Sequence, residues 1–284
     1  MGFVLPTLFA LLAACCNALA TVLQRRAALT VEQSSGFRLR LVGDLLRRPV
    51  WLAGVLAMTA AGVWQAVALA TGPLSLVQPL FVLELPLALL FASLVTRRRL
   101  PGAQVRDVSV VVAGLALALL SASPAGNRTR VSLDRWLPVL VGCAAAVLVL
   151  AAAGLRRPPG RARAGCLGAA TAICFAVTAG LMKTAVHVLA EDGVTGFLTA
   201  WQTYGFAAAG VCAVLLLGHA MQGGPLVASQ PALTLGDATV SLLLGVLVYE
   251  EHVRTGWWVL PELLGAGLVV GGVFGLATSG VSSA

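Results

Sequence analysis

Two acidic residues stand near the middles of long apolar stretches of the sequence: Glu84 within residues 73–96 and Asp237 within residues 225–249. On insertion scales a charge at the centre of a bilayer costs about 2.5–3.5 kcal/mol, so each carboxylate needs a partner, a proton or a wet cavity. Two such carboxylates indicate a site for a coupling proton or for a cation, which their oxygens would ligate. The alternative is a neutral or salt-bridged acid that only holds helices together.

Asp237 belongs to a row of polar residues that a helix places on one face: Gln230, Thr234, Asp237 and Ser241. Such a face should avoid lipid, so we expect it to line a cavity or a contact between helices. The first half of the chain keeps one counterpart, Gln78, and is otherwise apolar at the matching positions.

Prolines mark the same two stretches. Pro79 and Pro231 occupy matching places near their starts, and Pro86 follows Glu84 by two residues. Proline removes a backbone donor and frees a carbonyl, so we expect kinks where polar groups gather. The alternative is a kink that only shapes packing.

Other polar residues are candidates for the walls of a cavity. Lys183, with His187 one turn later, either pairs with a carboxylate, binds an anionic group or extends to the outer membrane surface. Gln202 and Tyr204 are candidate cavity residues, although such residues also serve in packing or in an interfacial belt. Glu262, near the outer end of the last apolar stretch, is either an entry residue or simply exposed.

Gly267, Gly271 and Gly275 form a stripe of small residues that allows close approach of helices. The stripe predicts either a homodimer seam or an internal contact.

Soluble-type catalysis has no support in the sequence. It contains no phosphate-cradling glycine loop, no HExxH and no GxSxG motif, so we expect neither an enzyme nor a cofactor. The six cysteines lie in apolar stretches, without CxxC or zinc-ligand spacing. No metal site is predicted beyond the two acids.

The composition shows what must position these residues. The 284 residues are 59% hydrophobic and only 11% charged, whereas a soluble domain carries about a quarter charged residues. Stretches of about 20 apolar residues cross a bilayer, and we expect about nine: 3–23, 50–70, 73–96, 108–123, 136–155, 165–189, 197–217, 225–249 and 256–276. The chain is therefore predicted to be an all-α membrane protein, with lipid as its surroundings.

Basic residues are distributed unevenly between alternate loops. Fourteen arginines fall on one predicted side and five basic residues, with Lys183 counted outward, on the other. The positive-inside rule places the fourteen in the cytoplasm, the N-terminus outside and the C-terminus inside a plasma or inner membrane. The short basic clusters argue against nucleic acid as a partner. In the first loop, Ser34 and Ser35 begin either an interfacial helix or a solvated basic loop.

The two halves of the chain are related. Residues 72–79 share the frame Gly-Pro-Leu followed by Gln-Pro with residues 224–231, and 113–115 match 266–268. We therefore predict a first repeat at 1–123, a connector with the fifth span at 124–155, and a second repeat at 156–284. Because corresponding spans are five apart, the copies must be inverted in the membrane.

The charges of equivalent loops agree with inversion. Residues 97–99 are three arginines, whereas the matching positions after the eighth span contain Glu250 and Glu251. Inverted repeats are common in secondary transporters, with the substrate near the midplane at the repeat interface.

Residues 72–80, which read GPLSLVQPL, and the ending Arg97-Arg98-Arg99-Leu100 resemble the third helix of the drug/metabolite transporter superfamily (EamA-like). Within it, the chain is most similar to the NIPA-type magnesium transporters. The segment Tyr249-Glu250-Glu251 resembles the superfamily's Gly-Glu ending. The resemblance implies a bundle of paired helical repeats, with nine spans and an outward N-terminus in the NIPA branch.

These observations favour a secondary transporter of a small metabolite or drug, acting in export and coupled to protons through Asp237 or Glu84. A divalent-cation transporter is the first alternative. The second is a membrane scaffold or lipid-handling protein that transports nothing.

Overall fold

The computed structural model describes residues 3–29, 48–97, 99–126, 128–129 and 131–279. Nine helices in this part of the chain are long and apolar enough to cross a bilayer. The chain is an all-α multi-pass membrane protein. Its elements are α1 (Val4–Leu29), α3 (Pro49–Thr71), α4 (Leu74–Leu80), a 3-10 turn (Phe81–Leu83), α5 (Glu84–Thr96), α6 (Gly102–Ala122), α7 (Leu133–Leu155), α8 (Arg161–Thr199), α9 (Trp201–Gly223), α10 (Leu226–Leu247), a second 3-10 turn (Gly256–Trp258) and α11 (Val259–Ser279).

Several helices are longer than the sequence predicted, and in α6 and α8 this is because polar residues that were read as loop are helical. The α6 helix begins at Gly102 rather than at 108. Its Asp107 is buried against Gly275 and pairs with Arg106 at 3.0 Å, so the charge does not end the helix. The α8 helix extends past Glu191 and Asp192 to Thr199, with a kink at Gly193, whose φ is +67°. A positive φ suits glycine because it has no Cβ.

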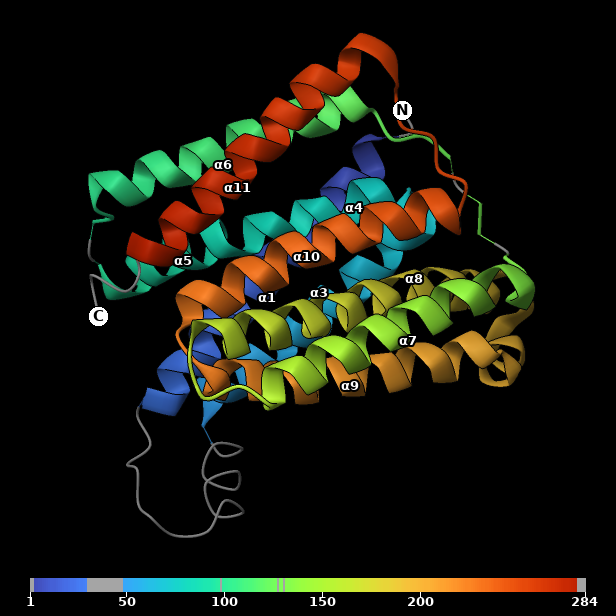
Figure 1. Cartoon of the computed structure of the whole chain (residues 1–284), viewed down its shortest axis with the longest axis horizontal. Coiled ribbons are helices and arrows are strands. Elements are labelled where there is room, and N and C mark those ends of the chain that lie inside the picture. The colour runs from blue at the N-terminus through green and yellow to red at the C-terminus, as the bar shows by residue number, and fades with distance from the viewer. Residues whose placement is uncertain (1–2, 30–47, 98, 127, 130, 280–284) are drawn as a thin grey trace, which may run out of the picture.

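The helices pack in pairs. The α1 helix packs along α3, α8 along α9, and α6 along α11. Figure 1 shows the α6–α11 pair on one side of the molecule and α7, α8 and α9 on the other, with α10 between them. The α10 helix contacts both α4 and α8, so it joins the two halves of the chain.

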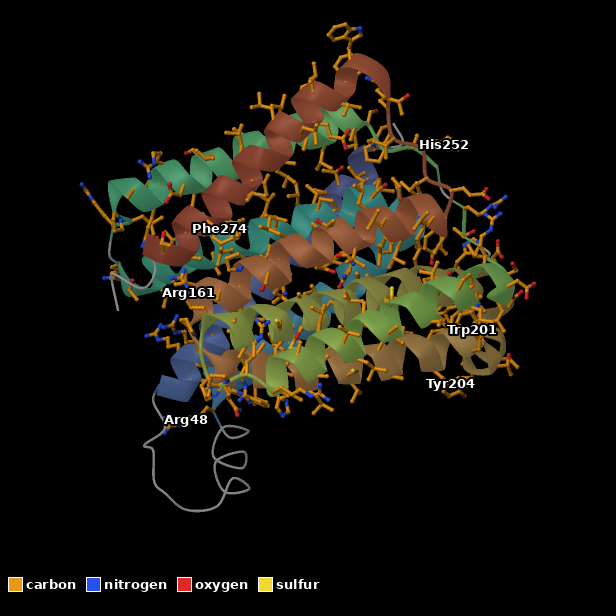
Figure 2. All side chains as sticks on the ribbon, in the orientation of Figure 1. Arg48, Arg161, Trp201, Tyr204, His252 and Phe274 are labelled. Carbon is orange, nitrogen blue, oxygen red and sulfur yellow. The ribbon has the colours of Figure 1, made fainter. Side chains whose placement is uncertain are left out.

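The two ends of the bundle differ in composition. Figure 2 labels Arg48 and Arg161 at one end, and Trp201, Tyr204 and His252 at the other. We call the first the arginine-rich end; the described loops there also contain Arg97, Arg99, Arg156 and Arg157. The α1 helix begins at the opposite end and α11 ends at the arginine-rich end (Figure 1), as an odd number of spans requires. The expected helix at Ser34 and Ser35 lies outside the described residues.

The third span is broken next to its acidic residue. Pro79 lies inside α4, the chain then forms the 3-10 turn Phe81–Leu83, and Glu84 begins α5. Proline removes the helical hydrogen bond that its own N–H would donate, which favours such a local tightening. In α10, by contrast, Pro231 lies in an uninterrupted helix. The two matched prolines therefore have different local consequences.

Glycines bring α6 and α11 into backbone contact, but only one of them belongs to the predicted stripe. A Cβ at Gly265 would lie 2.6 Å from the Gly114 carbonyl oxygen and 2.6 Å from the Ala118 nitrogen. Gly275 packs against the Asp107 carboxylate, whereas a Cβ at Gly267 or Gly271 would meet nothing within 4 Å. The internal seam thus uses Gly265 and Gly275, and Gly267 and Gly271 face outward.

We expect Gly265→Val to destabilise the protein and Gly267→Val to leave its stability unchanged. Overpacking a close contact costs about 1–3 kcal/mol, and here the obstructing atoms are backbone that no rotamer change can move. Thermal unfolding in detergent, followed by tryptophan fluorescence, measures the difference. Equal melting temperatures for the two variants would contradict this description of the α6–α11 seam.

Candidate functional site

The two predicted acids lie on elements that pack against each other. Glu84 opens α5 immediately after the 3-10 turn, and α10, which carries Asp237, contacts both that turn and α4. The structure therefore brings the elements that carry the two acids together, one from each half of the chain.

The hydrogen-bond partners of this acidic pair are neutral. The side-chain amide of Asn17 in α1 donates to Glu84 Oε2 at 2.8 Å, and the Thr21 hydroxyl, one turn later, donates to the Asn17 carbonyl oxygen at 3.0 Å. Ser241 donates to Asp237 Oδ1 at 3.5 Å, one turn along the predicted polar face. Among the described residues, no Lys, Arg or His forms an ion pair with Glu84 or Asp237. The hydrogen-bond donors to the two acids, within the part of the chain that the structure describes, are therefore uncharged.

The other residues of the predicted polar face are less exposed to a shared cavity than the sequence indicated. Gln78 and Ser241 are buried, while Gln230 and Thr234 are half-buried on α10. Pro86 is buried two residues beyond Glu84. These residues lie on α10 and the third span, the elements that carry the two acids.

Lys183 does not extend to the membrane surface. Its ammonium forms an ion pair with Glu251 Oε1 at 2.8 Å, and both side chains are fully buried. His187 does not join this pair; its Nε2 lies 2.9 Å from Glu191. The surface alternative for Lys183 is therefore wrong, and the expected pairing with a carboxylate is what the structure contains.

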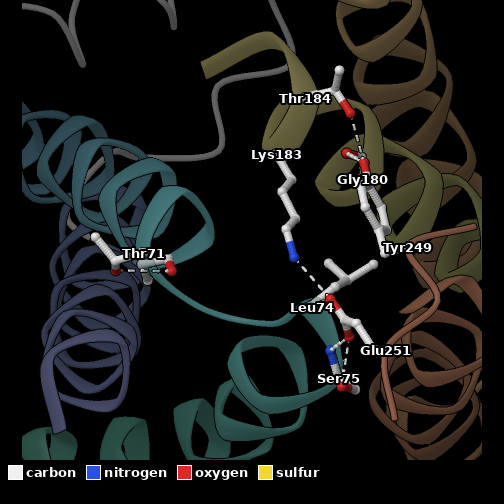
Figure 3. Close-up of polar contacts among 9 residues, drawn as sticks. Thr71, Leu74, Ser75, Gly180, Lys183, Thr184, Tyr249 and Glu251 are labelled. Carbon is white, nitrogen blue, oxygen red and sulfur yellow. Dashed lines mark hydrogen bonds and ion pairs between the residues drawn. The ribbon is translucent and has the colours of Figure 1, made fainter. Parts of the chain in front are cut away.

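Glu251 also holds the start of the third span, as Figure 3 shows. The N–H of Leu74 donates to Oε1 at 2.6 Å, and the N–H of Ser75 donates to Oε2 at 2.8 Å. The Ser75 hydroxyl donates to Oε2 as well, at 2.6 Å. Together with Lys183, these donors give the buried carboxylate four charge-assisted or neutral hydrogen bonds, which is what a buried charge requires.

Aromatic residues enclose this ion pair. The Lys183 ammonium lies 4.7 Å from the centre of the Tyr249 ring. The Tyr249 hydroxyl donates to the Gly180 carbonyl at 2.5 Å and lies 2.8 Å from the Thr184 hydroxyl (Figure 3). Trp136, fully buried at the start of α7, packs edge-on against Tyr249 at 6.0 Å.

A pocket of about 300 Å³ opens at the same end of the bundle, lined by Val131, Ser132, Thr184, Val188 and Gln202. Gln202 is therefore in a cavity wall, as predicted, and Thr184 joins the pocket to Tyr249. Tyr204 is 63% exposed, and its hydroxyl donates to the Leu198 carbonyl, so it lies outside this pocket.

Two loops are joined beside the pocket. Ala125 and His252 exchange backbone hydrogen bonds of 2.9 and 2.7 Å between the α6–α7 and α10–α11 connections. Glu250, the neighbour of Glu251, forms ion pairs with Arg128 and Arg135, and all three side chains are at least 42% exposed. Consecutive glutamates thus have opposite environments.

The role of Glu251 was missed by sequence reasoning, which assigned it to a loop. One signal was available: Lys183 is the single lysine of the chain and lies in an apolar span, where a charge needs a counter-charge. Which acid supplies it depends on the path of the chain after α10, which no local pattern contains.

Comparison with known proteins gives one informative relative. An uncharacterized protein of Corynebacterium glutamicum is 30% identical over 257 residues, which cover 89% of this chain and 88% of the relative. No family model matches the chain. No solved structure matches it either. The similarity extends over almost the whole bundle and names no activity.

Proposed function

We propose that this chain, which belongs to the same family as the uncharacterized protein of Corynebacterium glutamicum, is a secondary transporter that exports a small metabolite or drug by alternating access. One observation carries the proposal: Glu84 and Asp237 lie on elements of the two halves that pack together, and neither acid has a basic partner among the described residues. A salt-bridged acid that only held helices together would be neutralised by a cationic side chain. An acid without such a partner can bind and release a proton or a charged solute.

The packing of the helices supports two inverted repeats. If spans one to four correspond to six to nine, α1, α3 and the third span correspond to α8, α9 and α10. The α1 helix packs along α3 and also along the third span, and α8 packs along α9 and along α10. Two further contacts join corresponding helices of the two halves, α6 with α11 and α4 with α10. Exchanging the halves leaves each of these contacts unchanged. This is the pattern expected of a two-fold axis in the membrane plane.

A local contact repeats in the same way. Gly72, before the third span, packs against Pro6 near the start of α1. Its counterpart Gly224 packs near the start of α8, where an added Cβ would lie 3.2 Å from the Cβ of Ala164. Ala164 follows Pro6 by the same number of residues that separates Cys174 from Cys16, the pair that aligns the first spans. The two glycines at matching sequence positions therefore each pack against the start of the first helix of their own half.

The proposed orientation places the arginine-rich end in the cytoplasm, by the positive-inside rule. The resemblance of residues 72–80 to the drug/metabolite transporter superfamily supports the same assignment. We take the space around Glu84 and Asp237 as the point where the solute or the coupling proton binds.

A divalent-cation transporter is the second candidate, because carboxylate oxygens are the ligands that Mg²⁺ prefers. In the described part of the chain no group of three or more His, Cys, Asp or Glu residues gathers to hold a metal ion. Mg²⁺ would therefore have to keep several waters while bound to Glu84 and Asp237.

Reconstitution in liposomes tests these proposals. Vesicles with an imposed pH gradient are assayed for movement of labelled amino acids, of tetraphenylphosphonium, and of Mg²⁺ with an internal dye. Protein-dependent movement of an organic solute supports the proposal, and movement of Mg²⁺ alone would replace it with the second candidate. Scrambling of fluorescent phospholipid with no solute movement would show a lipid-handling protein instead. Protein-free vesicles are the control.

A further inference from the structure

Resting on the proposed function, we propose that Lys183, Tyr249 and Glu251 form a gate that closes the bundle at the end opposite the arginine-rich end. In the described conformation this gate is shut. Solute passes between that end and the acidic pair only after the Glu251 carboxylate has left Leu74, Ser75 and Lys183.

The position of the cluster is that of a gate. On the outer side, the pocket of about 300 Å³ ends at Thr184, whose hydroxyl bonds Tyr249. On the inner side, Glu84 follows Ser75 by nine residues, three of them in the 3-10 turn, which places it about 15 Å deeper along the span at about 1.5 Å per α-helical residue and 2.0 Å per 3-10 residue. The buried ion pair therefore lies between an open pocket and the proposed transport site.

The cluster also joins parts of the chain that must separate if the two repeats move against each other during alternating access. Ser75 and Leu74 belong to the first repeat, whereas Lys183 and Glu251 belong to the second. Within the cluster, one carboxylate accepts all the hydrogen bonds that Leu74, Ser75 and Lys183 donate. A shift of Glu251 thus breaks the polar link between the start of the third span and α8, and water can then solvate the charges.

Two features suit Glu251 to movement. It follows the end of α10 directly after Glu250, a non-glycine residue with a φ of +52°, which is a strained backbone conformation. Its carboxylate lies against Gly245, where an added Cβ would contact Oε2. Nearby, the indole N–H of Trp136 is buried without a hydrogen-bond partner among the described residues, and water entering on opening would supply one.

Gly245 offers a way to open the gate without removing a charge. In Gly245→Ala the new methyl group displaces the flexible end of Glu251 and also lies 3.3 Å from the Ser75 Cβ, so it pushes on both sides of this contact. A second variant, Lys183→Met with Glu251→Gln, removes both buried charges at once, which avoids leaving one of them unpaired. Glu250→Gln is the matched control, because the same chemical change then falls on the exposed neighbour.

Thiol accessibility measures the gate without requiring transport. The six native cysteines, all of them free, are replaced by alanine, and Gln78→Cys places a buried reporter one turn inside Ser75. A membrane-impermeant maleimide is added from the side that labels an Arg128→Cys control. We expect Gly245→Ala and the double variant to label at least tenfold faster than the parent, and Glu250→Gln to label at the parental rate. Unchanged labelling in both gate variants, or equal acceleration by Glu250→Gln, would overturn the proposal.

A cross-link tests the same gate in transport. An ideal Cβ at Gly245 lies 3.3 Å from the Cβ of Ser75, near the spacing of about 3.5–4.5 Å found in disulfides. Oxidised Ser75→Cys/Gly245→Cys protein should lose transport and regain it on reduction, whereas full transport when oxidised excludes a gate here. If the unmodified protein moves none of the probe solutes, the proposed function fails, while the labelling experiment still decides whether this end opens.

Discussion

Asp237→Asn is expected to lower proton-driven solute flux in proteoliposomes to the level of protein-free vesicles. The amide has the size of the acid and can still accept a hydrogen bond from Ser241, so the local packing should survive. It cannot exchange a proton or balance a cation, so Glu84 would be the one acid of the pair that is left. Initial rates under an imposed pH gradient measure the effect.

A double variant tests whether the two acids act as one site. Glu84→Gln should reduce flux as well, and the double variant should be no worse than Asp237→Asn alone, because either change removes the shared function. Glu262→Gln is the matched control: it neutralises another acid within a span, at the start of α11. Parental flux in Asp237→Asn, or an equal loss in Glu262→Gln, would exclude the acidic pair as the transport site.

Glu251→Gln is expected to destabilise the folded protein by about 3–5 kcal/mol, the usual cost of removing one partner of a buried ion pair. The ammonium of Lys183 would stay buried with the Tyr249 ring as its remaining partner, and at least one of the donors at Leu74 and Ser75 would lose its acceptor. Thermal or denaturant unfolding in detergent measures the loss.

The neighbouring residue supplies the comparison. Glu250→Gln breaks ion pairs of exposed side chains with Arg128 and Arg135, and such pairs contribute about 0–1 kcal/mol. Because only Glu251 is buried, we expect a large difference between the two variants in the free energy of unfolding. If Glu250→Gln proved as destabilising as Glu251→Gln, the buried network would not be the main support of this end.

The number of spans followed directly from the sequence, because hydropathy acts over about 20 consecutive residues and needs no tertiary contact. The errors lie at polar residues near the helix ends, which the sequence indicated as loop although they are helical. Asp107 continues α6 because Gly275 leaves room for it, and the acidic residues Glu191 and Asp192 remain helical in α8. The glycine stripe was misplaced for a similar reason: Gly267 and Gly271 have the right spacing, but the orientation of α11 turns Gly265 toward α6.

The sequence by itself determined that Glu84, Asp237 and Lys183 are charges in apolar spans, and that each therefore needs a partner or a function. Only the tertiary structure decided which of these residues find a partner of opposite charge. Lys183 and Glu251 are 68 residues apart and become a neutral buried pair, while Glu84 and Asp237, which lie on packed elements of the two halves, have no basic partner among the described residues. The physical reason is that desolvation acts on each residue locally, whereas the counter-charge that offsets it is supplied by whichever helix the fold brings alongside.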